Sequence, residues 1–451
     1  MSTLPIVNPF HWGFRGTVDQ VFNPDGTVPL KLKNGQELQL HDFISKEVPA
    51  LADRSQFELN PYLFTGYLQT MYLFGADFSK SNLAFYGREI VNFSDGGIST
   101  ADWLKSGWES KYGLDKASGK FNREKFAEDA SATHPESWPR LHPRTRFLTS
   151  PELEETHQSE KPLVVILHGL SGGSHELICR ALALQIAQIS GGKFDVVVLN
   201  SRGCARSKIT TRKLFYALFT DDLHEFLSRE KKWHPNKKIY TVGFSFGGTI
   251  LGNYLGQKGS RSLVTAAAIL STPWDLYLSA VKMNDDWWSR KLFSKSIAQF
   301  LVRLVKVNMK ELEFKDTDEK PKEPPSLEHP SFDVFTADNL KKAYSFKSTA
   351  EFDNVFTAPC LGFKTANEYY NACGSIHQLP NVKVPLLIIN SKDDPMVGEE
   401  AIPFKYSREN KNVTLCVTDL GGHLAYLDRS HNPWAITQIA NYFCKFDELV
   451  Q

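Results

Sequence analysis

The sequence lacks a charge imbalance, a cysteine pattern and a metal-ligand pattern. Its 52 lysine and arginine residues nearly equal its 51 aspartate and glutamate residues, so nucleic acid is not predicted as a partner. The six cysteines form no C-x-x-C pair and have no regular spacing, which predicts free thiols in a reducing compartment. No histidines and carboxylates are spaced as metal ligands, so neither a metal nor another bound cofactor is predicted.

Long apolar runs are also missing. No stretch reaches the roughly 18 uninterrupted apolar residues of a membrane-spanning helix. The first ten residues have neither the basic nor the apolar region of a secretion signal, so we expect an intracellular, cytoplasmic protein. The most apolar stretch, residues 62–74, is interrupted by Gly66, Gln69 and two threonines. It is predicted to be a packed helix, with an aromatic face that could contact a lipid surface.

From residue 161 onward, short apolar runs alternate with helix-length amphipathic segments. The apolar runs lie before Ser245 and at 162–167, 194–199, 266–271, 385–389 and 413–417. Runs of this kind are typical of strands buried on both faces of a parallel sheet. Helices are expected between or after them at 176–189, 214–230 and 434–446. The alternation predicts an α/β fold with a mostly parallel, doubly wound sheet.

Two segments fall outside this alternation. Residues 1–80 are predicted to form an N-terminal extension. Residues 272–384 are too many for one crossover, so we expect a helical cap over the active site, with a mobile loop near 315–325. The core is then predicted to comprise residues 81–271 and 385–451. Within its first part, Asp95-Gly96-Gly97 predicts the turn of a hairpin.

Ser245 lies in the run Gly243-Phe-Ser-Phe-Gly247, between an apolar strand and an amphipathic helix. In this context G-x-S-x-G is typical of a nucleophile elbow, a strained turn that exposes the serine hydroxyl. Glycine is expected two residues before and two residues after the serine, because the turn brings these positions close together. The alternative interpretation is a strand-to-helix junction that contains a serine by chance.

A serine nucleophile needs a base, and a carboxylate that orients the base. Asp393 and Asp394 directly follow a buried strand, and His423 follows the last strand after two glycines. The proline after Asp394 favours Asp394 as the catalytic acid, with Asp393 as the alternative. The order Ser245, Asp394, His423 is that of α/β hydrolases and predicts a catalytic triad.

Two loops are expected to support the triad. The backbone N–H groups of Leu170, in a glycine-rich run after the first buried strand, and of Phe246, directly after the nucleophile, are predicted to form an oxyanion hole. His168 is expected to orient the loop that contains Leu170. Arg202 and Arg206 are expected to brace loops by hydrogen bonding, with a phosphate or coenzyme A contact as the alternative.

Four motifs together resemble the α/β-hydrolase superfamily: H-G-L at 168–170, G-F-S-F-G at 243–247, N-S-K-D-D-P at 390–395 and G-G-H at 421–423. Longer runs resemble the fungal medium-chain fatty-acid ethyl ester synthase/esterases: N-P-F-H-W-G at 8–13, S-R-G-C-A-R-S at 201–207, T-P-W-D at 272–275 and D-L-G-G-H-L-A-Y-L at 419–427. This resemblance implies transfer of a medium-chain acyl group from coenzyme A to ethanol, and hydrolysis of such esters. It also implies association with lipid droplets or the mitochondrial outer membrane.

The resemblance also draws attention to the pattern H-x-x-x-x-D at 423–428, which is sometimes interpreted as an acyltransferase signature. His423 is already required by Ser245. We therefore expect Asp428 to be a helix-start residue, where the positive end of the helix favours a carboxylate.

The function predicted from these observations is serine-dependent acyl transfer through an acyl-enzyme. Its partners would be medium-chain acyl-CoA, as a substrate, together with ethanol and fatty-acid esters. Two alternatives remain open. A monoacylglycerol lipase or general carboxylesterase would use the same triad, whereas a non-catalytic lipid-binding protein on the hydrolase fold would not use it.

Overall fold

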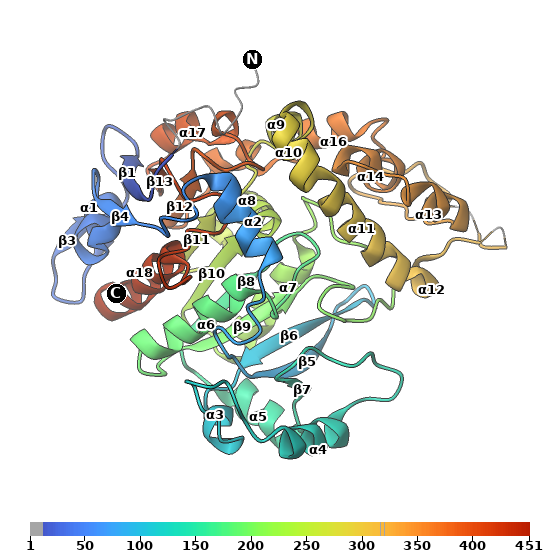
Figure 1. Cartoon of the computed structure of the whole chain (residues 1–451), viewed down its shortest axis with the longest axis horizontal. Helices are drawn as coiled ribbons and strands as arrows, with labels where there is room; N and C mark the ends of the chain where they lie inside the picture. Colours follow the sequence, from blue (N-terminus) through green and yellow to red (C-terminus); the bar gives the residue numbers. More distant parts are fainter. Residues whose placement is uncertain (1–11, 316, 320) are drawn as a thin grey trace.

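A computed structural model describes residues 12–315, 317–319 and 321–451 (Figure 1). Most of the run at 8–13 lies outside these residues. The centre of the described structure is a row of six parallel strands. They are β8 (Leu163–Leu167), β9 (Asp195–Asn200), β10 (Ile239–Phe244), β11 (Ala266–Leu270), β12 (Leu386–Ser391) and β13 (Val413–Thr418). The six apolar runs of the sequence therefore all form strands, as predicted.

Further strands extend this row at both edges, and their pairings are antiparallel except for that of β7 with β5. At one edge β5 (Tyr86–Asn92) and β6 (Ile98–Leu104) form the predicted hairpin, and β7 (Thr145–Phe147) pairs with β5. At the other edge lie β1 (Arg15–Val21) and β4 (Gln56–Glu58). The eleven-stranded sheet of the described residues has the order β4-β1-β13-β12-β11-β10-β8-β9-β6-β5-β7. A separate pair is formed by β2 (Pro29–Lys31) and β3 (Glu37–Gln39).

The N-terminal segment does more than extend the core. β1 pairs with β13 in the register Val18 to Thr418, and the side chain of Val18 is fully buried. The segment also contributes α1 (Leu40–Glu47), whose Phe43 packs into the main core, and α2 (Gly66–Gly75). The sequence did not predict that this segment, through β1 and β4, completes one edge of the central sheet.

Helices cover both faces of the sheet, as expected for a doubly wound fold. One face is covered by α6 (Leu177–Ile189) and α18 (Trp434–Leu449), which pack into one core with strand residues such as Val164. The other face is covered by α7 (Asp221–Trp233), α8 (Phe246–Lys258) and α17 (Phe404–Glu409), which pack into a second core with residues such as Val165. Alternate strand residues thus enter opposite cores.

One helix begins later than predicted. The sequence predicted a helix over 214–230, but α7 begins at Asp221. Asp221 and Asp222 lie in its first turn, where carboxylates are favoured by the helix dipole. Leu214 and Ala217 are buried instead as part of a loop that packs against the cap. Their apolar character reflects this long-range packing and not a helix.

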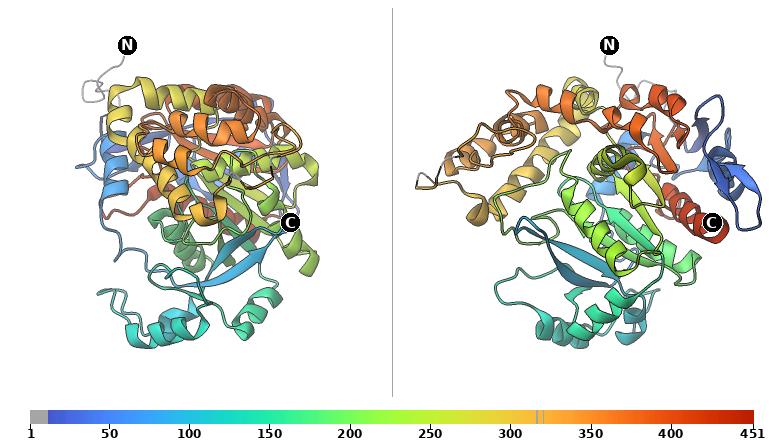
Figure 2. Two further views of the ribbon diagram at one scale, coloured as in Figure 1. Left: turned by 90° about the vertical axis from the view of Figure 1, so that its right-hand side faces the viewer. Right: turned by 180° about the vertical axis from the view of Figure 1, so that it is seen from behind.

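Residues 272–384 form a helical layer, seen from yellow to orange in Figures 1 and 2. In both figures this layer and the segment with α3 (Gly107–Lys111), α4 (Arg123–Thr133) and α5 (Ser150–Gln158) lie at opposite ends of the molecule. The cap contains α9 (Leu276–Asp285), α10 (Trp287–Ser289), a π-helical turn (Arg290–Ser294), α11 (Lys295–Val307), α12 (Met309–Leu312), α13 (Ala337–Ala343), α14 (Thr349–Val355), α15 (Thr357–Cys360) and α16 (Ala366–Cys373).

The cap has its own apolar core. Leu301 and Val305 of α11 pack with Phe352 and Phe356 around α14, and the loop with Leu214 joins this cluster. The linker at 315–325, predicted to be mobile, includes residues 316 and 320, which lie outside the described residues. Its Asp318 forms an ion pair of 2.6 Å with Arg212 of the core.

Candidate active site

Ser245 lies at the sharp turn between β10 and α8. Its backbone has φ +51° and ψ −120°, a strained conformation for a residue with a side chain. A Cβ atom on Gly243 would lie 2.5 Å from Cα of Gly248, and one on Gly247 would lie 2.4 Å from the carbonyl oxygen of His168. Both glycines are therefore required by space, and the turn is the predicted nucleophile elbow.

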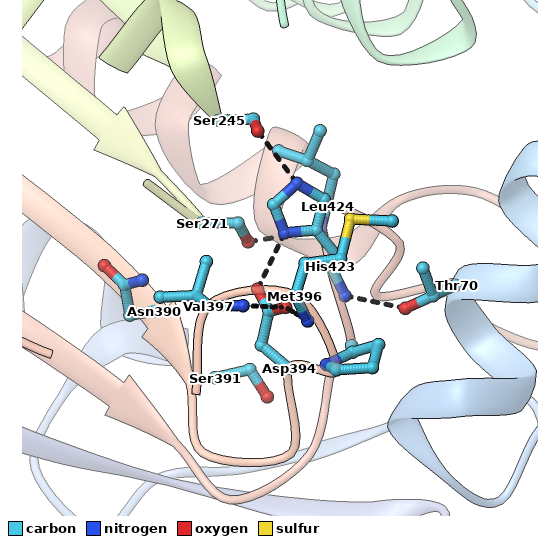
Figure 3. Close-up of polar contacts among 12 residues, drawn as sticks. Thr70, Ser245, Ser271, Asn390, Ser391, Asp394, Met396, Val397, His423 and Leu424 are labelled. Carbon is cyan, nitrogen blue, oxygen red and sulfur yellow. Dashed lines mark hydrogen bonds and ion pairs between the residues drawn. The ribbon is translucent and has the colours of Figure 1, made fainter. Parts of the chain in front are cut away.

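The structure brings Ser245, His423 and Asp394 together in one hydrogen-bonded row (Figure 3). Nε2 of His423 lies 2.9 Å from Oγ of Ser245, and Nδ1 lies 2.8 Å from Oδ2 of Asp394. The three side chains come from the ends of β10, β12 and β13, at the carboxyl edge of the parallel strands. With Nδ1–H donating to Asp394, Nε2 is free to accept the proton of the serine hydroxyl.

Asp394 and Asp393 have different environments. The second carboxylate oxygen of Asp394 accepts hydrogen bonds from the N–H groups of Met396 (2.8 Å) and Val397 (3.0 Å). Asp393 does not contact the imidazole. Its carboxylate accepts from the N–H of Gly422 (2.8 Å) and from the hydroxyl of Ser391, and burial raises its pKa to about 7. The geometry thus favours Asp394 as the orienting acid and assigns Asp393 to the support of the histidine loop.

The loop that carries His423 is held from two other parts of the chain. The N–H of His423 donates to Oγ1 of Thr70 (2.9 Å), and the N–H of Leu424 donates to Oγ of Ser271 (3.1 Å). Gly422 has φ +66°, and a Cβ there would lie 2.6 Å from the carbonyl oxygen of Gly66. Thr70 and Gly66 belong to α2, so the N-terminal segment is part of the site. Sequence reasoning missed Thr70 and Ser271, because no local pattern marks them.

Replacing Thr70 with valine is expected to slow the reaction of Ser245 with a fluorophosphonate serine probe about tenfold. The buried N–H of His423 then has no acceptor, which costs about 1–3 kcal/mol and loosens the position of the imidazole. The measurement is the second-order labelling rate constant. Thr70→Ser keeps the hydroxyl and serves as the matched control. Equal rates for Thr70→Val and wild type would contradict this role of Thr70.

The predicted oxyanion residues border the same site. Gly169, next to Leu170, lies beside Ser245, since a Cβ on Gly169 would be in van der Waals contact with the serine Cβ at 3.6 Å. Leu170 and Phe246 both line the cavity in front of Ser245. Among the described residues, neither of their N–H groups donates to a protein acceptor. Both are thus available to a substrate oxygen.

His168 orients the loop of Leu170, as expected. Its Nδ1 lies 2.7 Å from the carbonyl oxygen of Gly169, and its Nε2 accepts from the N–H of Ser201 at 3.0 Å. Burial lowers the pKa of His168 to about 4, so the ring is neutral and bridges two loops.

Two other expectations have clear outcomes. All five N–H donors of Arg202 are used by Asp95, Asp222 and Thr211, so Arg202 braces loops and has no donor left for a phosphate. Arg206 donates to carbonyl oxygens at 140 and 141.

The expected helix-start role of Asp428 is wrong. α18 begins at Trp434, and the Asp428 carboxylate accepts from N–H groups at 430 and 432 in a turn.

The triad opens into a cavity of about 470 Å³ between the core and the cap. Ser245, His423, Leu170 and Phe246 line its core side. The cap side is mainly apolar and includes Leu276, Ala280, Phe293, Ile297, Leu301, Leu304, Phe335, Phe352 and Phe356. Such a lining suits an acyl chain.

Two carboxyl groups interrupt the apolar lining. Asp353, on the cap side, accepts hydrogen bonds of 2.5 Å from Tyr370 and from Thr357, and burial raises its pKa to about 6. Glu176 lies at the N-terminal end of α6.

The described residues contain no candidate for a membrane-spanning helix or for a metal centre. No helix there is long and apolar enough to cross a membrane. No group of three or more histidine, cysteine, aspartate or glutamate side chains in this part of the chain is placed to hold a metal ion.

Residues 162–430 match the α/β hydrolase fold family. Medium-chain fatty acid ethyl ester synthase/esterase 2 of Saccharomyces cerevisiae is 55% identical over 451 residues, which cover 100% of this chain and 99% of the yeast protein. The monoacylglycerol lipase of the same yeast is 30% identical over 91% of this chain and 84% of its own. Among solved structures, the Pyrococcus furiosus esterase Pf2001 is 14% identical with a TM-score of 0.44, over 84% of this chain and 96% of the esterase.

The family match covers more than half of the chain and contains all three residues of the Ser245–His423–Asp394 row. The likeness to the yeast ethyl ester synthase/esterase extends over the whole chain, including α2 and the cap. The chain therefore belongs to the α/β hydrolase fold family, in the group that contains the fungal medium-chain fatty acid ethyl ester synthase/esterases.

Proposed function

We propose that this protein is a serine acyltransferase and esterase that forms medium-chain fatty-acid ethyl esters from acyl-CoA and ethanol and hydrolyses such esters. The observation that carries the proposal is the Ser245–His423–Asp394 row at the wall of an apolar cavity. The name of the 55% identical yeast relative supports the substrate class. Acyl-CoA is a substrate in this scheme, and no bound cofactor is required.

In the first step, Oγ of Ser245 attacks the thioester or ester carbonyl while Nε2 of His423 takes the hydroxyl proton. The N–H groups of Leu170 and Phe246 stabilise the negative oxygen of the tetrahedral intermediate. Asp394 stabilises the imidazolium that forms. The intermediate collapses when the coenzyme A thiolate or the alkoxide leaves with the proton from His423, which gives an acyl-enzyme.

In the second step, ethanol or water attacks the acyl-enzyme and gives its proton to His423. Collapse of the second intermediate returns that proton to Ser245 and releases an ethyl ester or a free acid. Synthesis and hydrolysis are thus two outcomes of one intermediate. The apolar lining of the cap favours the first by limiting the access of water.

Competition between ethanol and water for one acyl-enzyme predicts a specific ratio of products. The ratio of ethyl octanoate to octanoate should rise in proportion to ethanol, and it should be the same from octanoyl-CoA and from p-nitrophenyl octanoate. Both donors give the same acyl-enzyme, so the acceptor step cannot distinguish them. Gas chromatography of the products at several ethanol concentrations measures the ratio. Different ratios from the two donors, or no ethyl octanoate at all, would refute the proposed reaction.

Two other functions that the sequence left open, an ester hydrolase and a non-catalytic lipid-binding protein, can be distinguished by experiment. Monoacylglycerol or general carboxylester hydrolysis would use the same three residues, and the 30% identical yeast relative is named as a monoacylglycerol lipase. A non-catalytic lipid-binding protein would not react with a fluorophosphonate probe. The complete row of hydrogen bonds at Ser245 favours an enzyme.

We also propose peripheral contact with a lipid surface, such as a lipid droplet or the mitochondrial outer membrane. Met71 and Phe74 of α2 and Phe300 of α11 line the cavity, and their exposed fractions are 43%, 52% and 50%. Exposed apolar side chains at the mouth of a lipid-binding cavity suit substrates that partition into lipid.

A further inference from the structure

The carboxyl group of Glu176 is a polar group of the cavity that the proposed mechanism does not use. It lines the same cavity as Ser245 and His423. Glu176 is the N-cap residue of α6, yet its side chain accepts no capping hydrogen bond from that helix. Among the described residues it forms no side-chain hydrogen bond and no ion pair. Glu176 is partly buried, and its unpaired carboxyl group is open to a molecule bound in the cavity.

The loop before α6 leaves space for this carboxyl group. A Cβ atom on Gly172 would lie 2.3 Å from Oε1 of Glu176. Gly172 does not have a positive φ, so the backbone itself does not demand glycine there. Burial raises the pKa of Glu176 to about 7, with no neighbouring cation to oppose it. The site therefore holds a hydrogen-bonding group that no protein group satisfies.

The position of Glu176 relates it to the alcohol part of an ester. Leu177, the next residue, packs in one apolar cluster with Ala425 and Leu427, which follow His423 in the chain. Nε2 of His423 must pass its proton to the leaving oxygen, so the alcohol part of the substrate lies on the histidine side of Ser245. Asp353, the other carboxyl group of the cavity, lies in the cap and already has two hydrogen-bond donors.

A simple alcohol cannot serve both His423 and Glu176. The single O–H group of ethanol gives its proton to His423 during attack, and no second donor is left for a carboxyl group. An alcohol with a further hydroxyl group, such as glycerol, has that second donor. We propose that Glu176 is a hydroxyl-binding subsite for esters of polyols, which makes monoacylglycerols substrates of the same acyl-enzyme reaction. The inference rests on the proposed serine chemistry.

The reaction at this subsite balances without another reactant. Ser245 takes the acyl group from a monoacylglycerol, glycerol leaves with the proton from His423, and water then releases the fatty acid. Glu176 forms and breaks no covalent bond. It accepts a hydrogen bond from a hydroxyl group that does not react. Its effect should therefore depend on the alcohol part of the substrate and not on the acyl chain.

The test compares two substrates with the same acyl chain, 1-octanoylglycerol and ethyl octanoate. In Glu176→Leu, kcat/KM for 1-octanoylglycerol divided by kcat/KM for ethyl octanoate is expected to fall about tenfold. This corresponds to about 1.4 kcal/mol for the loss of one hydrogen bond. Glu176→Gln keeps an acceptor oxygen and should restore much of the ratio. The matched control is Asp353→Asn, which changes the other cavity carboxyl and should leave the ratio unchanged. A general loss of activity lowers kcat/KM for both substrates equally, so it does not change their ratio.

An unchanged ratio in Glu176→Leu would overturn the subsite, and so would a fall in the ratio caused by Asp353→Asn instead. Activity of the wild-type enzyme on ethyl octanoate reports separately on the proposed function. If the wild type hydrolyses 1-octanoylglycerol but not ethyl octanoate, the proposed ethyl ester function is wrong. Loss of glycerol-ester hydrolysis in Glu176→Leu would then still support the subsite. Absence of both activities overturns both proposals.

Discussion

Replacing Ser245 with alanine is expected to lower kcat for octanoyl transfer by about 10⁵-fold. The variant keeps the cavity, the oxyanion N–H groups and His423, but it has no atom that can form the acyl bond. The strained turn at Ser245 exposes this hydroxyl, and glycine is needed at 243 and 247 because a Cβ at either position would clash. Residual activity would then come from water attacking a substrate that is bound but not covalently attached.

Intact-protein mass spectrometry after rapid quenching checks this directly. Wild-type protein incubated with octanoyl-CoA should carry one octanoyl group on Ser245, and Ser245→Ala should carry none. Ser260→Ala is the matched control, because Ser260 is an exposed serine just beyond the other end of α8. Activity within tenfold of wild type in Ser245→Ala, or an adduct on another residue, would show that the nucleophile has been assigned wrongly.

The sequence predicted the parts of this site that depend on short patterns. The apolar runs such as 163–167 are buried on both sides, so their composition alone identifies them as central strands. Gly243 and Gly247 identify the elbow in the sequence, because a side chain at either position would clash with the turn itself or with the end of β8 and the loop that follows it. Chain order then selected His423 among 13 histidines, and the structure brings its imidazole to Ser245.

The support of the site could not be predicted in this way. Thr70 accepts a hydrogen bond from His423 across a separation of 353 residues, and β1 joins the sheet through β13, almost 400 residues away in the chain. Such contacts depend on the assembled fold and leave no spacing in the sequence. Glu176 was missed for a related reason. Its position at the start of α6 suggests a cap, and only the cavity shows that the carboxyl group has another role.

The two adjacent aspartates allow a second large effect to be tested with a matched pair. Asp394→Asn is expected to lower kcat about 10⁴-fold, because an amide in place of Oδ2 favours the wrong tautomer of His423. Asp393→Asn should lower kcat less than tenfold, since an amide oxygen can still accept from Gly422 and Ser391. The measurement is kcat on p-nitrophenyl octanoate for both variants. Equal losses would mean that both carboxylates act on the imidazole.

Asp393 should show its role in stability instead of in catalysis. Its folded-state pKa is raised to about 7, against about 3.9 in an unfolded chain. Between these values the folded state holds a proton that the unfolded state has lost, so wild-type stability falls as pH rises from about 4 to about 7. Asp393→Asn removes this dependence. The free energy of unfolding of Asp393→Asn minus that of the wild type should therefore increase by on the order of 4 kcal/mol between pH 4 and pH 7. Urea unfolding of both proteins at several pH values measures the difference. A constant difference from pH 4 to pH 8 would mean that Asp393 is ionised in the folded protein throughout, and the loop of His423 would then be held by a charged carboxylate.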